Sequence, residues 1–325
     1  MSVPDDRLAH GADPVSDALD RAGALAEVGR DEEAEALLRR ALADEPEDAA
    51  LHAALAQVLL RRGEHGPALE HAERTVALAP EVGFGHALRS MVLSTDLRRR
   101  REAVDAAREA VRLDPEESYG HLTLARACLR SRWFPEALDA ADRAVGLDPE
   151  DADGHGLRGA ALMGLGRPAD AEQAMREALR LQPGDGDALH DLGVAVSVQG
   201  RDRQDEARGL FVDAARADPT DRHARASMVS ASRKAVYGTW GWPLVGFAVL
   251  RALIYLFGDD AAARGPGTAA WLVVAAAVAT FLLVRGRLRR RKLSDPERRA
   301  LRESRWTGRI RAPRTMPTRR RGRRR

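Results

Sequence analysis

The stretch PADAEQAMREALRLQP, residues 168–183, decides the fold. Its apolar residues recur at steps of three and four, which is the pattern of a helix packed on one side, and Pro183 ends it. Similar stretches precede five more prolines at spacings of 34 to 36 residues, and the six prolines are Pro46, Pro80, Pro115, Pro149, Pro183 and Pro219. A fixed period of this length indicates a repeat architecture whose stacked units share one core.

Small residues recur at fixed distances before each of these prolines. Twelve residues before it there is always an alanine: Ala34, Ala68, Ala103, Ala137, Ala171 and Ala207. Five residues before it there is an alanine in every copy but one, which has Thr75. Alanine at a helix crossing lets two backbones approach closely. We therefore predict antiparallel helix pairs, with a left-handed glycine after several first helices, at Gly63, Gly166 and Gly200.

This pattern resembles the tetratricopeptide repeat family, with six copies over residues 15–219. The resemblance implies an all-α fold, a right-handed helical solenoid of about six helix pairs. It also implies a concave face, lined by the first helices, that binds peptides or partner proteins, and it does not imply catalysis. The chain departs from the family at the early aromatic position, where the family often has Trp and this chain often has His.

The family's inward-facing positions give a candidate groove for a partner. Placed on this chain, they are Gln57, Arg61, Tyr119, Leu122, Arg126, Arg130 and His190. Apolar and arginine side chains together would suit a peptide with carboxylates, since arginine binds these bidentately. The alternative is an ordinary solvated face. The family's clamp for chaperone tails uses Asn and Lys, which this region lacks, so a cochaperone role is disfavoured.

Five histidines recur once per repeat and raise the question of a metal site. They are His52, His86, His121, His155 and His190. Metal–nitrogen bonds are about 2 Å long, whereas equivalent positions on stacked helices lie on the order of 10 Å apart. We therefore expect half-buried histidines between helices, replaceable by Phe without loss of the fold, and no metal or other cofactor. The single cysteine, Cys128, is expected in the core, and in the absence of a catalytic motif we expect no enzyme.

The C-terminal third of the chain predicts a membrane hairpin. Residues 265–284 are twenty consecutive uncharged residues, and about 20 residues cross a bilayer. Residues 239–257 are similar but contain Arg251, which could reach the interface from near the end of a span. These patterns predict transmembrane helices at 237–258 and 268–285, joined by an external loop at 259–267.

Charge supports an orientation for this hairpin. The chain carries +3 and the segment from Arg285 onward carries +16, so the preceding 284 residues carry −13. A basic collar follows the second span: Arg285, Arg287, Arg289, Arg290, Arg291 and Lys292. Because basic flanks stay in the cytoplasm, we expect a multi-pass protein of the cell membrane with cytoplasmic repeats and tail. The collar would bind anionic lipid headgroups at the membrane surface.

The remaining segments complete the predicted organisation. We expect a disordered N-terminus at 1–14, a capping or juxtamembrane helix at 220–236 and a basic juxtamembrane helix at 286–306. Ser294 and Glu297 form a capping-box pattern in the last of these. Residues 307–325 contain no acid and no hydrophobic period, which predicts a disordered arginine-rich tail that binds lipid first and nucleic acid second.

Together these patterns favour a membrane-tethered scaffold or adaptor that binds a peptide or partner protein in its groove. Two alternatives remain open. One is an assembly or regulatory factor that binds nucleic acid or acidic partners through the arginine-rich tail. The other is a non-catalytic subunit of a membrane enzyme complex.

Overall fold

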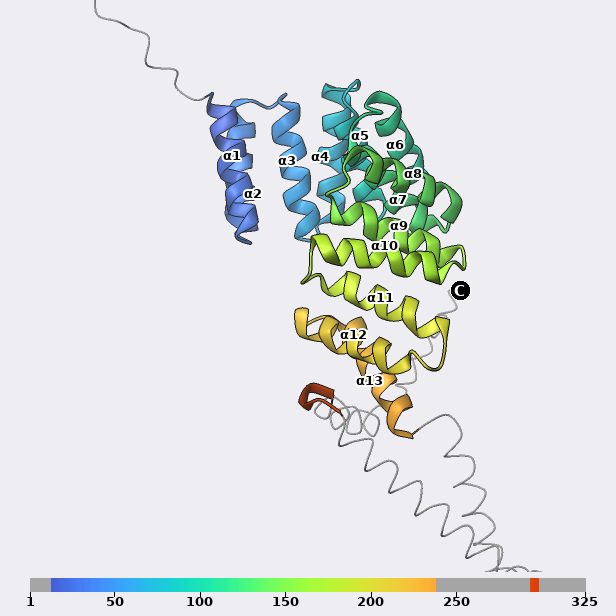
Figure 1. Cartoon of the computed structure of the whole chain (residues 1–325). Coiled ribbons are helices and arrows are strands. Elements are labelled where there is room, and N and C mark those ends of the chain that lie inside the picture. Colours follow the sequence, from blue (N-terminus) through green and yellow to red (C-terminus); the bar gives the residue numbers. More distant parts are fainter. Residues whose placement is uncertain (1–12, 238–292, 298–325) are drawn as a thin grey trace, which may run out of the picture. The chain divides into compact units, whose positions relative to one another are not determined.

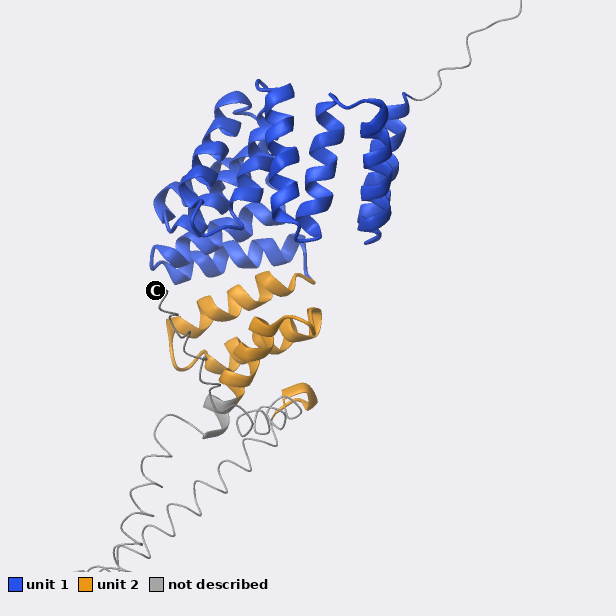
Figure 2. Ribbon diagram, turned by 180° about the vertical axis from the view of Figure 1, so that it is seen from behind, with its two compact units in different colours: residues 1–183 blue, residues 184–325 orange. Residues whose placement is uncertain are grey.

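Helices account for all regular secondary structure in residues 13–237 and 293–297, which are the residues that the computed structural model describes (Figure 1). The chain divides into two compact units, residues 1–183 and residues 184–325 (Figure 2). The described part of the first unit contains α1 (Pro14–Glu27), α2 (Asp31–Asp44), α3 (Ala49–Arg61), α4 (His65–Leu78), α5 (Gly83–Leu93), α6 (Arg100–Leu113), α7 (Ser118–Ser131), α8 (Phe134–Leu147), α9 (Ala152–Gly164) and α10 (Pro168–Leu181). The described part of the second contains α11 (Gly186–Gln199), α12 (Gln204–Ala217) and α13 (Arg222–Tyr237).

The first unit has two layers. Each odd-numbered helix from α1 to α9 is the first of a pair, and those from α1 to α7 contact the next odd-numbered helix. Each even-numbered helix contacts the first helix of its own pair, and those from α2 to α8 also contact the first helix of the following pair. The unit is therefore an all-α helical solenoid with the first helices in one layer and the second helices in the other, as the period predicted.

The recurring alanines lie at helix crossings, as predicted. All six alanines that precede a repeat proline by twelve residues are at most 1% exposed. In the pair of α9 and α10, a Cβ atom on Gly159 would lie 3.4 Å from the carbonyl oxygen of Ala171 and 2.7 Å from Cγ of Met175. Small residues on both helices are thus what allows the close backbone approach.

The turns between paired helices confirm two of the three predicted glycine caps. Gly63 and Gly166 have positive φ angles of 77° and 73°. The prediction for Gly200 was wrong, since its φ is 178°, which is extended backbone. The connection from α11 to α12 carries the additional residues of the 36-residue copy and does not need the tight turn. The equivalent residue after α7 is Arg132, whose φ is 62°.

Replacing Arg132 by glycine is expected to raise the free energy of unfolding by about 0.5–1 kcal/mol, because glycine adopts the left-handed region without a Cβ clash. The lost interaction of its guanidinium with the Phe134 ring, 6.0 Å away, is at the long limit of such contacts. Urea unfolding followed by circular dichroism measures the change. An Arg132→Ala variant separates strain from side-chain loss, and a less stable Arg132→Gly would contradict the strain argument.

The recurring histidines link each repeat to the next. The Nε2 atoms of four of them lie 2.9–3.1 Å from the carbonyl oxygens of repeat prolines, in the pairs His52–Pro46, His86–Pro80, His121–Pro115 and His155–Pro149. A carbonyl only accepts, so Nε2 carries the proton and donates. The histidines are half-buried or buried, as predicted. Phe would retain an aromatic ring but would leave the carbonyl without this donor. Replacing these histidines by Phe should therefore destabilise the fold more than the sequence indicated.

In the second unit, residues 293–297 pack against α13. Glu297 is almost fully buried, and its carboxylate accepts hydrogen bonds from the Ser232 hydroxyl at 2.8 Å and from the Ser294 backbone N–H at 2.6 Å. The bond from the Ser294 N–H confirms the glutamate half of the predicted capping box. Arg208 of α12 lies 3.8 Å from the same carboxylate. A residue 60 positions beyond α13 thus completes the packing around Ser232.

The predicted transmembrane hairpin and multi-pass membrane localisation are corrected. Among residues 13–237 and 293–297, no helix is long and apolar enough to cross a membrane. The longest, α13, has 16 residues and includes Arg222, Arg225, Arg233 and Lys234, whereas a span needs about 20 predominantly apolar residues. The segments on which the prediction rested, 238–258 and 268–285, lie outside the described residues, as do 1–12, the loop at 259–267 and the tail at 307–325.

Candidate binding surface on the first helices

An aromatic pair lies on neighbouring first helices of the first unit. The ring centroids of Phe84 on α5 and Tyr119 on α7 are 5.4 Å apart. Each residue follows a repeat proline by four positions, so the repeat itself brings the two rings together. The Tyr119 hydroxyl donates to Sδ of Met91 at 2.8 Å, and burial raises the pKa of Tyr119, which keeps this donor protonated. Phe84 remains 39% exposed.

The surface continues from α7 to α9. A Cβ atom on Gly154 would lie 3.8 Å from Cδ2 of Leu122, so the two first helices meet there closely. Arg126 of α7 forms an ion pair with Asp153 of α9. A Cβ atom on Gly156 would meet no atom within 4 Å, so this position borders open space. Along α7 and α9, apolar side chains and one ion pair therefore lie beside an open position on the surface.

The predicted groove residues lie in three places. Tyr119, Leu122, Arg126 and Arg130 are together on α7, and Gln57 and Arg61 are on α3. Arg61 lies 2.7 Å from Asp31, so it has an acidic neighbour within the chain, as Arg126 does. Arg130 is exposed and has no ion-pair partner among the described residues. Of the three predicted arginines, Arg130 is therefore the best placed to bind a carboxylate from a partner.

His190 belongs to the second unit, where its own neighbours engage it. Its Nε2 lies 2.9 Å from the Ser227 hydroxyl and its Nδ1 lies 3.2 Å from Asp191. The ring is also 5.6 Å from that of Phe211. These contacts are those of a packing residue between α11, α12 and α13.

Three residues of this surface were not predicted from the sequence: Phe84, Met91 and Asp153. A signal for Phe84 was available, because it has the same position in its repeat as Tyr119. Met91 and Asp153 carry no comparable signal, since they join the surface only through contacts with a neighbouring helix.

The predicted anion-binding collar, Arg285 to Lys292, lies outside the described residues. Nothing in residues 13–237 and 293–297 supports a lipid or nucleic-acid partner. In the same residues no group of three His, Cys, Asp or Glu side chains is placed to hold a metal ion. Cys128 is buried, and burial raises its pKa to about 12, so the thiol is a poor nucleophile.

Comparisons with known proteins agree with this architecture. Family models described as "Tetratricopeptide repeat" match residues 19–82, 96–152 and 152–185. The comparison with curated proteins found no match.

Solved structures with a similar fold include PilW, described as a type IV pilus biogenesis factor, and a tetratricopeptide repeat protein from Parabacteroides merdae. PilW has a TM-score of 0.57 and 15% identity over 66% of this chain and 99% of that chain. The P. merdae protein has a TM-score of 0.55 and 14% identity over 66% of this chain and 82% of that chain. The Pseudomonas aeruginosa protein pilF has a TM-score of 0.50 and 17% identity over 67% of this chain and 94% of that chain. At such identities the likeness concerns the fold alone.

Residues 19–82 and 96–185 of this chain, which the family models match, are therefore tetratricopeptide repeats.

Proposed function

We propose that the repeat array is a non-catalytic protein–protein interaction scaffold. A peptide or partner segment would bind along the first helices α3, α5, α7 and α9 of the first unit. The observation that carries this proposal is the aromatic pair of Phe84 and Tyr119, which leaves Phe84 39% exposed on a helix that is otherwise well packed. Aromatic side chains contribute a large share of the energy of protein interfaces.

The neighbours of this pair indicate the chemistry of the partner. An apolar or aromatic side chain would stack on Phe84, with the free space beside Gly156 accommodating the adjoining chain. A carboxylate of the same partner would pair with Arg130, which lies further along the same face of α7 as Tyr119. Arg126 is already paired with Asp153, so it contributes less new attraction. A short acidic and apolar segment fits this surface best.

A non-catalytic role agrees with the chemistry of the described residues. The thiol of Cys128 is buried and its pKa is raised to about 12, and the Tyr119 hydroxyl is bound to Met91. Catalysis needs an activated nucleophile or a general acid–base pair beside a substrate site, and neither residue provides one. The relatives in the tetratricopeptide repeat family support the same role.

Site-specific photocrosslinking in cells tests the scaffold. The photoreactive residue benzoylphenylalanine would replace Gln57 or Gly156 on the first helices, one at a time, in the full chain. The same residue at Asp139, which is exposed on α8 in the other layer, is the control. We expect adducts of defined mass from positions 57 and 156 and none from 139. Equal adducts from all three positions, or none from the first helices, would overturn the proposal.

A further inference from the structure

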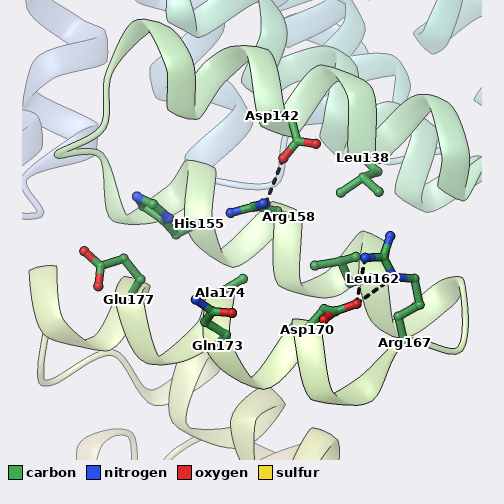
Figure 3. A pocket seen from close by; sticks show the side chains of 10 residues that line it. All are labelled: Leu138, Asp142, His155, Arg158, Leu162, Arg167, Asp170, Gln173, Ala174 and Glu177. Carbon is green, nitrogen blue, oxygen red and sulfur yellow. Dashed lines mark hydrogen bonds and ion pairs between the residues drawn. The ribbon is translucent and has the colours of Figure 1, made fainter.

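A pocket lies between α8, α9 and α10, on another side of α9 from the proposed binding surface (Figure 3). His155, Arg158 and Leu162 of α9 line it, at a spacing that places them on one side of that helix. Asp153 and Gly156 belong to the surface described above, so the two regions are distinct. The pocket has a volume of about 360 Å³, near the lower end of the range for ligand sites.

In the repeat that forms the pocket, an arginine stands where three other repeats have leucine. The ninth residue after the repeat proline is a buried leucine at Leu55, Leu124 and Leu192, but it is Arg158 in this repeat and Arg89 on α5. The Arg158 side chain turns towards α8, where its Nε lies 2.8 Å from Oδ1 of Asp142 (Figure 3). It therefore leaves space above Leu162 and Ala174, which are both buried.

One hydrogen-bond acceptor of the pocket lacks a donor. His155 is 7% exposed, and its Nε2 donates to the Pro149 carbonyl at 3.1 Å. In the neutral ring Nδ1 must then be an acceptor, and it has no hydrogen-bond partner within the described residues. A buried acceptor without a donor is unfavourable, so a ligand that supplies an N–H to this side of the pocket would be favoured.

The charges around the pocket favour a cation. Three carboxylates line it, those of Asp142, Asp170 and Glu177, against the two guanidinium groups of Arg158 and Arg167. Glu177 also has an exposed ion pair with Arg180, 2.8 Å away on the same helix. Exposed pairs of this kind are weak, so the Glu177 carboxylate can bind a second cation. The pocket thus combines a carboxylate that is held only by an exposed pair, an acceptor without a donor, and apolar walls.

We propose that this pocket binds a guanidinium group, supplied by an arginine side chain of a partner polypeptide. A guanidinium has five N–H donors in a planar fork and an apolar stem. Its donors match Glu177 and Nδ1 of His155, and its stem matches Leu162 and Ala174. The volume of about 360 Å³ accommodates one such side chain. The pocket would add a second, chemically different contact to the scaffold.

Chemical-shift titration of the full chain with acetyl-arginine amide tests the proposal. We expect saturable shifts at His155 and Ala174, with a dissociation constant on the order of 1 mM for so small a probe. Acetyl-citrulline amide has nearly the same shape without the charge and should bind at least about tenfold more weakly. No saturable shift, or equal binding of citrulline or of acetyl-lysine amide, would overturn the assignment.

Two variants and a matched control locate the site. Arg158→Leu restores the residue of the neighbouring repeats, and should keep the fold while reducing arginine binding at least about tenfold, because the leucine fills the space. Glu177→Gln should weaken binding several-fold. Glu109→Gln on α6 removes the same charge from the same kind of exposed pair, with Arg112 at 2.6 Å, and should change nothing. Unchanged binding in Arg158→Leu would contradict the proposal, whatever the crosslinking at the first helices shows.

Discussion

Alanine at both Phe84 and Tyr119 is expected to reduce partner binding by at least about tenfold, because a hot-spot aromatic typically contributes 2 kcal/mol or more. The two rings lie 5.4 Å apart and Phe84 is partly exposed, so their removal takes away both stacking and buried area. The readout is the yield of the adduct formed by benzoylphenylalanine at position 57. The helical circular dichroism signal should remain, since neither side chain lies in the alanine-lined crossings.

The control for this pair changes two apolar residues that are more exposed but lie outside the helices. Val28 is 70% exposed and lies in the turn after α1. Leu97 is 63% exposed and lies in the turn before α6. Alanine at both should leave the adduct yield unchanged. If this control lowers the yield as much as the Phe84 and Tyr119 variant does, binding depends on exposed apolar area in general and not on the first-helix surface.

The second large effect concerns stability. Leucine in place of Ala171 is expected to lower the free energy of unfolding by about 2–3 kcal/mol, because there is no space for three further carbon atoms at a close helix crossing. Ala171 is fully buried, and its carbonyl oxygen lies 3.4 Å from where a Cβ of Gly159 would be. Thermal unfolding followed by circular dichroism should show a midpoint lower by several degrees.

Ala169→Leu is the matched control for this substitution. Ala169 is on the same helix, α10, two residues earlier, and it is exposed. The same change in size and helix propensity should there alter the midpoint little. Equal losses in both variants would mean that leucine disturbs α10 itself, and the argument from the crossing would fail.

The repeat pattern predicted the fold well because it depends on local steric rules. Pro183 and its counterparts end helices, and alanines such as Ala171 mark where helices cross. The same reasoning failed at Gly200, because glycine permits the left-handed turn but does not require it. It also did not identify Arg132, which adopts that turn in place of glycine. A pattern of residue types indicates where a turn lies more reliably than it indicates the turn's geometry.

The candidate binding surface was predictable only in part. Tyr119 and Arg130 were found by their positions in the repeat, and Phe84 could have been found in the same way. Arg61 and Arg126 were expected to bind carboxylates of a partner, but each already has a carboxylate of this chain beside it. Which charges are already paired depends on the side chains of the adjacent helix, and a single helix sequence does not contain this information. The hairpin prediction rested on hydropathy and flanking charge, without any helix of the described residues to support it.

The sequence by itself determined the helix pairs, their 34-residue period and the small residues at the crossings, because these follow from steric limits within and between neighbouring helices. Only the tertiary structure decided which side chains meet across the repeats: Phe84 with Tyr119, Arg126 with Asp153, and Arg158 with Asp142. These contacts join residues about 16 to 35 positions apart, and they depend on how one repeat is stacked on the next. Stacking brings these side chains together, and for that reason the contacts of the candidate surface and of the pocket became visible only in three dimensions.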